Sequence, residues 1–168
     1  MADPVFILDD AKLRAALRGL EKAMSDMSPI MDEIGQTLQD EIRMTLGRGQ
    51  TPWGEDMEPL KSRQGVPLND TRQHIYNRIT HTFDSKSVAI GMNEEVGIGK
   101  THQFGAVIKP KKASRLVFTV DGKKVFAKKV TIPARPFLPI RNDAVDLPPQ
   151  WRESLINIIK TALKDAIK

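Results

Sequence analysis

The sequence predicts an α+β fold, and three observations point to that class. Apolar residues recur at helical spacing over 1–47 and again over 148–168. Between these regions, two segments alternate apolar and polar residues with the period of a β-strand. The length of 168 residues suits one hydrophobic core. We therefore expect one domain over 1–168, with a helical hairpin in 1–47, an antiparallel sheet of about four strands in two hairpins, and a terminal helix in 148–168.

The N-terminal region predicts two amphipathic helices joined by a short polar link. The first runs from about Asp10 to Met24, and its apolar face is formed by Leu13, Ala16, Leu17 and Leu20. The second is expected to begin at Ser28-Pro29, an N-cap followed by proline, and to end at Gly47 and Gly49. Its stripe consists of Met31, Ile34, Leu38, Ile42 and Leu46. Both stripes need cover from a sheet or from another subunit.

The middle of the chain predicts an irregular loop followed by a first hairpin. Residues 48–69 are rich in Gly, Pro and polar residues, and we expect Trp53 to anchor this loop. A short helical turn is expected from Asp70 to Tyr76. Strand patterning then begins, so that Asn77 to Met92 is expected to form a β-hairpin with a turn at its centre.

A second hairpin is predicted around Asp121-Gly122, a dipeptide that suits a two-residue type I′ turn. Its register follows from the turn: Val120 pairs with Lys123, Phe118 with Val125, Leu116 with Ala127, and Val117 with Phe126. Both faces of this hairpin therefore carry apolar pairs. Either both faces are buried inside the monomer, or a neighbouring subunit covers one of them.

The last part of the chain predicts a rigid extended segment and a final helix. Three prolines between Ile132 and Pro139 exclude a helix or a central strand. The final helix is expected after Pro148-Pro149, with Trp151 in its first turn. Its apolar arc is wide, which indicates burial on more than one side. The candidate oligomer interface therefore consists of Val117, Phe126, Ile156 and Leu163.

The composition excludes several classes of protein. There is no cysteine, which excludes disulfides and thiolate metal sites. No segment has the roughly 20 apolar residues of a membrane span, and we expect no export signal and no membrane contact. The net charge of +5 is uneven, because Lys100 to Arg141 holds eleven Lys or Arg residues and one acid. This basic segment could bind nucleic acid, bind an acidic partner, or keep an exposed hairpin soluble.

Candidate catalytic and cofactor sites have little support in the sequence. Gly97 to Thr101 is similar to the end of a phosphate-binding P-loop, but the first glycine of that motif is replaced by Glu94. His74, His81 and His102 show no i, i+4 pairing typical of a metal site, and His81 is expected on the apolar side of its strand. No nucleophile elbow or acidic pair stands out. We expect no enzyme activity, no cofactor and no metal.

Nucleic-acid binding is the main alternative to a structural role. The basic segment lies largely on the second hairpin, where aromatic residues alternate with lysines. The candidate contacts to DNA or to an acidic partner are Lys123, Lys124, Lys128 and Lys129. Aromatic residues at this spacing are more often core residues than platforms for bases, and no helix-turn-helix or zinc finger accompanies them.

Two short motifs in order carry a resemblance to a known family. His102-Gln103-Phe104-Gly105 is followed some thirty residues later by Ile132-Pro133-Ala134-Arg135-Pro136-Phe137-Leu138. Upstream lie Trp53 in a polar loop, Pro59-Leu60, and the strand Val88 to Gly91. This order resembles the Mu-like phage virion morphogenesis, or tail completion, family.

The resemblance implies a small α+β structural protein that completes or caps the head-proximal end of a phage tail for head-tail joining. It implies a ring-like homo-oligomer of about six subunits, with the tail tube and the head-tail connector proteins as partners and DNA contact in the channel. The expected location is the virion tail, and the host bacterial cytoplasm during assembly.

Within the two motifs, the residue types predict structural roles. Phe104 is expected to anchor in the core, Gly105 to allow an unusual backbone angle, and His102 and Gln103 to hydrogen-bond the adjoining loop. Arg135 is held between prolines, and two interpretations stay open for it. It could pair with a carboxylate across a subunit boundary, or it could be a surface arginine.

Overall fold

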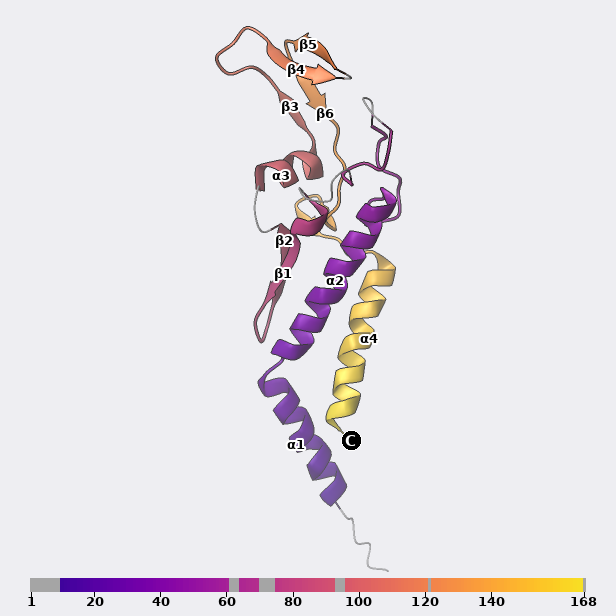
Figure 1. Cartoon of the computed structure of the whole chain (residues 1–168). Helices are drawn as coiled ribbons and strands as arrows, with labels where there is room; N and C mark the ends of the chain where they lie inside the picture. Colours follow the sequence, from indigo (N-terminus) through magenta and orange to yellow (C-terminus); the bar gives the residue numbers. More distant parts are fainter. Residues whose placement is uncertain (1–9, 61–63, 70–74, 93–95, 121, 168) are drawn as a thin grey trace, which may run out of the picture.

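The molecule is elongated, with long helices toward one end, a pair of strands at the other, and a further hairpin of strands beside the helices (Figure 1). The computed structural model describes residues 10–60, 64–69, 75–92, 96–120 and 122–167. Helices α1 (Ala11–Ser25), α2 (Ser28–Arg48) and α4 (Pro149–Ala166) form one end, and the paired strands β4 and β5 form the other. The predicted α+β class is confirmed.

The two N-terminal helices do not fold back on each other as a hairpin. Helix α2 bends away from α1 and continues along the long axis of the molecule, and both helices pack against α4 (Figure 1). The predicted helical hairpin in 1–47 is therefore wrong. Gly19 of α1 lies so close to the backbone of Ala166 that a Cβ atom there would overlap its carbonyl oxygen. Helix α4 thus takes the place that the sequence pattern assigned to α2, while Leu13 and Leu17 stay exposed.

The core forms along the predicted stripe of α2. Ile34, Leu38, Ile42 and Leu46 are buried, and Trp151 of α4 and Phe137 close the same cluster. Gly49 ends the helix as predicted, with a φ of +72° and an N–H that donates to the Leu46 carbonyl oxygen, whereas Gly47 still lies inside the helix. Ser28 is not the N-cap, because it already lies in the helix and its N–H donates to the Asp26 carboxylate at 2.9 Å.

Among the described residues, the strands form four separate two-stranded antiparallel ladders instead of one sheet. The two predicted hairpins are β1 (Ile79–Phe83) with β2 (Val88–Met92), and β4 (Leu116–Val120) with β5 (Lys123–Ala127). One helix and two further ladders were not predicted. The helix is α3 (Val96–Phe104). The ladders are β3 (Ala106–Ile108) with β6 (Val130–Ile132), and β7 (Ile140–Arg141) with β8 (Ala144–Val145).

The register predicted for the second hairpin is confirmed, and the first hairpin forms within the predicted bounds. Phe83 pairs with Val88 next to the turn of the first, and Val117 pairs with Phe126 in the second. Asp121 lies outside the described residues, and Gly122 has the positive φ, +76°, that a type I′ turn requires. Most of the predicted turn from Asp70 to Tyr76 also lies outside the described residues, and a 3-10 helix follows at Tyr76–Arg78.

Residues 106–132 form a two-stranded arm that projects from the body of the molecule (Figure 1). The ladder β3–β6 is its base and β4–β5 its tip. Residues 109–115 form a basic insertion between β3 and β4, opposite only Lys128 and Lys129 on the returning chain. Within the described chain, β4 and β5 pack on each other, and neither strand has an extensive contact with a helix. The arm therefore lacks a second layer.

None of the helices in the described part of the chain is long and apolar enough to span a membrane.

Candidate functional site

The two sequence motifs meet in space at the base of the arm. His102 to Gly105 end helix α3 and lead directly into β3, while Ile132 ends β6 and begins the proline-rich segment. Ala106 and Ile132 are paired across the ladder, so the chain enters and leaves the arm at one point. We call this junction, residues 102–105 with 132–138, the arm root.

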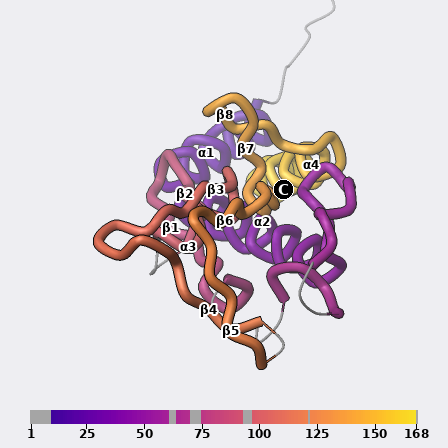
Figure 2. The backbone as a smooth tube through the Cα atoms, turned by 90° about the horizontal axis from the view of Figure 1, so that it is seen from above, coloured from indigo at the N-terminus to yellow at the C-terminus, as the bar shows by residue number. Residues whose placement is uncertain are grey.

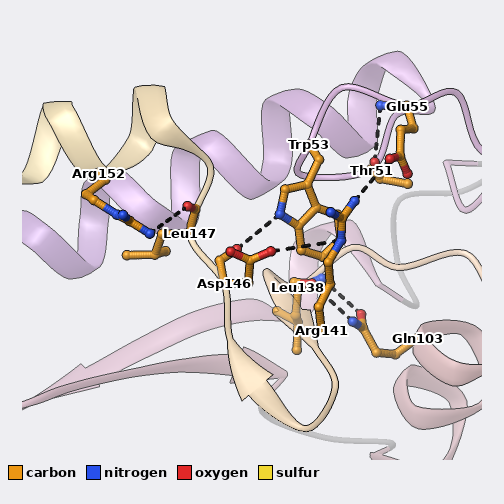
Figure 3. Close-up of polar contacts among 9 residues, drawn as sticks. All are labelled: Thr51, Trp53, Glu55, Gln103, Leu138, Arg141, Asp146, Leu147 and Arg152. Atoms are coloured by element: carbon orange, nitrogen blue, oxygen red, sulfur yellow. Dashed lines mark hydrogen bonds and ion pairs between the residues drawn. The ribbon is translucent and has the colours of Figure 1, made fainter.

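Gln103 ties the two halves of the arm root together. Its side chain is buried, with 3% of its surface exposed. The side-chain oxygen accepts from the backbone N–H groups of Phe137 (3.0 Å) and Leu138 (2.9 Å), and the nitrogen donates to the Leu138 carbonyl at 3.1 Å (Figure 3). One amide therefore pairs three backbone groups that the prolines keep out of a β-ladder. This is the loop contact that the sequence predicted for Gln103.

Gly105 turns the chain from α3 into the arm. Its φ is +73°, in the left-handed region that disfavours residues with a Cβ atom. A Cβ built there would also lie 3.0 Å from the Ala134 nitrogen and 3.0 Å from the Ile132 oxygen. The position thus needs glycine both for its backbone angle and for its close approach to the second motif.

Arg135 is neither a surface arginine nor, in the described chain, the partner of a carboxylate. It is 6% exposed, and its guanidinium donates to the carbonyl oxygens of Glu58 (2.9 Å) and Pro59 (3.2 Å). The interpretation as a surface arginine is therefore wrong, while pairing with a carboxylate across a subunit boundary stays a prediction. The prolines hold the arginine so that its side chain reaches inward to the loop containing Trp53. There the guanidinium supplies hydrogen-bond donors to carbonyl oxygens that lie outside any strand or helix.

His102 contacts the second motif through its backbone, because its carbonyl oxygen accepts from the Arg135 N–H at 2.7 Å. The side chain makes no such contact: Nδ1 is buried and has no hydrogen-bond partner in the described structure. Burial lowers the pKa of His102 below its ordinary value, and the nearby charge of Arg135 lowers it further. The predicted side-chain hydrogen bond of His102 to the adjoining loop is therefore not observed.

The core anchor of the arm root is Phe137 and not Phe104. Phe137 is 1% exposed, whereas Phe104 at the end of α3 is 53% exposed. The predicted burial of Phe104 is wrong because it follows the buried Gln103 in helix α3, so its ring points to another side of the helix, beside the groove along β3 and β6. Ile132, Pro133 and Pro136 are half-buried around this junction.

A second polar cluster pins the loop that the arm root touches (Figure 3). The indole N–H of Trp53 donates to the Asp146 carbonyl at 3.2 Å, which confirms Trp53 as the anchor of its loop. The Arg141 guanidinium lies 3.7 Å above the Trp53 ring and pairs with Glu55 at 3.0 Å. No local pattern near Trp53 indicated these partners, because Arg141 and Asp146 are distant along the chain.

His81 also has a structural environment. Its Nε2 lies 2.9 Å from an Asp32 carboxylate oxygen and its Nδ1 lies 2.9 Å from the Gln39 side chain. With the Gln39 amide oriented to donate to His81, its oxygen accepts from Arg43 at 2.8 Å. This chain of contacts joins α2 to β1, and its histidine has partners on both ring nitrogens, as expected of a satisfied half-buried residue.

The other candidate sites of the sequence do not assemble. Gly97 to Thr101 lie inside helix α3, so their N–H groups do not form an open phosphate-binding loop. Glu94 and His74 lie outside the described residues. Among the residues that the structure describes, no group of three or more His, Asp or Glu side chains is placed to hold a metal ion.

The candidate interface residues all lie on the surface of the described chain. Val117 and Phe126, on one face of the arm tip, are each 58% exposed, and Ile156 and Leu163 of α4 are 42% and 37% exposed. The four candidate lysines, Lys123, Lys124, Lys128 and Lys129, are exposed as well. Burial of both hairpin faces within the monomer is thus excluded.

Comparison with known proteins adds two matches. The model of the phage virion morphogenesis family matches residues 8–164. The chain is also 31% identical over 128 residues to Mu-like prophage FluMu G protein 2 of Haemophilus influenzae, a match that covers 76% of each chain. No solved structure matches the chain. The family match spans the helices, the arm root and the arm together.

Proposed function

Because the chain belongs to the phage virion morphogenesis family, we propose that it is a structural protein that acts late in tail assembly. In this proposal it completes or caps the head-proximal end of the tail, so that the tail can join the head. It works as a ring of about six subunits, with the tail tube and the head-tail connector proteins as its partners. Its role is stoichiometric and not catalytic, and it stays in the virion tail after assembly in the host cytoplasm.

The exposed apolar faces of the arm are the observation that carries this proposal. An isolated two-stranded hairpin is marginally stable in water unless a third strand or a helix packs on it. The arm tip has neither within the described chain, and Val117, Phe118 and Phe126 are all exposed. An apolar surface of this kind is typical of a subunit contact. Ile156 and Leu163 on α4 offer a second contact for the same assembly.

Light scattering coupled to size exclusion tests the proposal across a range of protein concentrations. A ring predicts a discrete mass of about six subunits. Phe126→Lys should abolish that mass, because it puts a charge into the apolar contact. Leu13→Lys is the matched control, since Leu13 is equally exposed, at 60%, but lies on α1 away from the arm. A strict monomer, both alone and with added tail tubes, would contradict the proposal.

A nucleic-acid-binding role is the second candidate, favoured by the exposed lysines of the arm. It predicts that replacing Lys128 and Lys129 with glutamine weakens DNA binding and reduces the slope of log K against log salt, by about 0.9 for each lost phosphate contact. A structural role predicts little binding to free DNA and no such change.

A further inference from the structure

A groove on the flank of the body is the counterpart of the arm. It lies between α2, hairpin β1–β2, ladder β7–β8 and α4, and it has a volume of about 270 Å³. All of its lining residues are apolar, among them Leu38, Ile90, Ile140 and Leu155. We call it the flank groove. It lacks the few polar groups that orient a small molecule, and it is smaller than the roughly 300–1,000 Å³ of ligand pockets. Apolar side chains of a protein are the occupants it suits.

One wall of the flank groove carries an unusually exposed apolar residue. Val145 is 74% exposed, the highest value among the large apolar residues that the structure describes. The turn before it places Asn142 and Asp143 at φ values of +50° and +59°, as in a type I′ turn, and this tight turn closes the short ladder. Asp143 and Asp146 stand on either side of Val145 in the chain, and the Asp146 carboxylate also lies 4.0 Å from Arg141.

The arm has the complementary chemistry. Val117 and Phe126 project from its tip, and a hollow of about 270 Å³ lies between its two ladders, lined by Ile108, Leu116 and Val130 among others. Between Ala106 and Ile132 there are eight Lys or Arg residues and one acid, a net charge of +7. With a total of +5, the rest of the chain has a net charge of −2. A basic, apolar arm therefore matches an apolar groove on a body of opposite net charge.

The arm of a given copy does not occupy its own flank groove. Seen along the long axis, β4–β5 and β7–β8 lie on opposite sides of the molecule (Figure 2). Two arms are also poor partners for each other, because each has a net charge of +7. DNA would neutralise the lysines but would leave the apolar faces of Val117 and Phe126 without cover. A second copy of the chain supplies both the apolar groove and the opposite charge.

We propose that the arm of one copy lies in the flank groove of the next, with Val117 and Phe126 against the groove and Val145 against the hollow of the arm. The contact is head-to-tail, since different surfaces meet, and head-to-tail contacts close into rings when the rotation permits. The inference deepens the proposed function and rests on it, because it names the surfaces that join subunits in the assembly.

Cysteine cross-linking tests this contact directly, because the chain has no cysteine of its own. Thr119→Cys places a thiol on the exposed face of the arm, and Ala144→Cys places one beside Val145, so that every apolar contact is kept. The two variants, distinguished by a mass tag, are mixed and treated with a short bifunctional maleimide. The expected result is a cross-linked pair that contains one copy of each variant. Thr119→Cys mixed with Leu13→Cys is the control and should give none.

The possible outcomes separate the inference from the function. A pair of two Thr119→Cys copies, or equal cross-linking to the Leu13→Cys control, would overturn the arm-to-groove contact. A discrete oligomer in light scattering without the mixed pair would overturn this contact alone and leave the ring intact. A monomer at every concentration without the mixed pair would count against both. As a check on charge, Val145→Lys should abolish the mixed pair, since it sets a cation against the lysines of the arm.

Discussion

Replacement of Gln103 tests whether the arm root is held by one side-chain amide. Gln103→Met keeps the volume of the side chain but removes its donor and its acceptor. Three backbone groups then lose their partners: the N–H groups of Phe137 and Leu138 and the carbonyl of Leu138. The arm root is anchored by Phe137, which is 1% exposed, so we expect water to replace these partners poorly.

The magnitude follows from the three lost hydrogen bonds. Each contributes about 1 kcal/mol net, and a buried group left without a partner costs about 1–3 kcal/mol. We therefore expect Gln103→Met to lower the free energy of unfolding by about 3 kcal/mol, a large part of the roughly 5–15 kcal/mol of a typical domain. Water that reaches the root would reduce the loss toward the lower end of this range.

Urea unfolding followed by tryptophan fluorescence measures this loss, because Trp151 is buried in the core cluster and reports on unfolding. Gln36→Met is the matched control, since Gln36 lies on the exposed side of α2. A surface change of this type should shift stability by less than about 0.5 kcal/mol. A loss below about 1 kcal/mol for Gln103→Met, or equal losses in the two variants, would refute the assigned role of Gln103.

Three further predictions address the other residues of the root. Arg135→Met should cost about 3 kcal/mol in urea unfolding, because it removes two charged hydrogen bonds to the Glu58 and Pro59 carbonyls, whereas the exposed Arg152→Met should cost little. Gly105→Ala should cost clearly more than Gly54→Ala: both add roughly 1–2 kcal/mol of backbone strain, but only at Gly105 does the new Cβ meet backbone atoms at 3.0 Å. Equal costs would show that packing against Ala134 is unimportant. Burial and Arg135 lower the pKa of His102, so the unfolded chain binds more protons than the folded one below a pH of about 6.5, and stability should fall as the pH falls through that window. His102→Gln should flatten that part of the pH profile, and an unchanged profile would contradict the assignment.

Elements whose signals are local could be predicted from the sequence. The stripe of α2, the end of α2 at Gly49 and the register of the second hairpin depend on neighbouring residues, and all were predicted correctly. The pairing of β3 with β6 could not be predicted in this way, because the strands are three residues long and the insertion of residues 109–115 hides their relation. The direction of α1 also depends on distant contacts, namely on whether α2 or α4 covers its face.

The arm root was predicted in position but only partly in mechanism. The sequence indicated that the two motifs belong together, and Gln103 and Gly105 behave as their residue types predict. For the aromatic residues, the prediction chose Phe104 as the anchor, while the structure buries Phe137. Aromatic character alone does not decide between two rings, because Gln103 occupies the buried side of α3 and Phe104 beside it points to another side of the helix. The inward direction of Arg135 likewise depends on carbonyls about 76 residues away.

The construction of the arm root has a consequence for assembly. A two-stranded arm without a covering layer would sample many directions if its base were a free loop, and fixing one direction on binding would cost conformational entropy. Gln103, Gly105 and Arg135 fix both chain crossings at the base before any partner is present. Most of the conformational entropy of the base is then lost during folding. Binding through the exposed side chains of the tip therefore loses less conformational entropy. The two motifs form no catalytic site in the described chain and yet bury an amide and a guanidinium. Their physical role is to hold the direction in which the arm projects, which is what the proposed subunit contact needs.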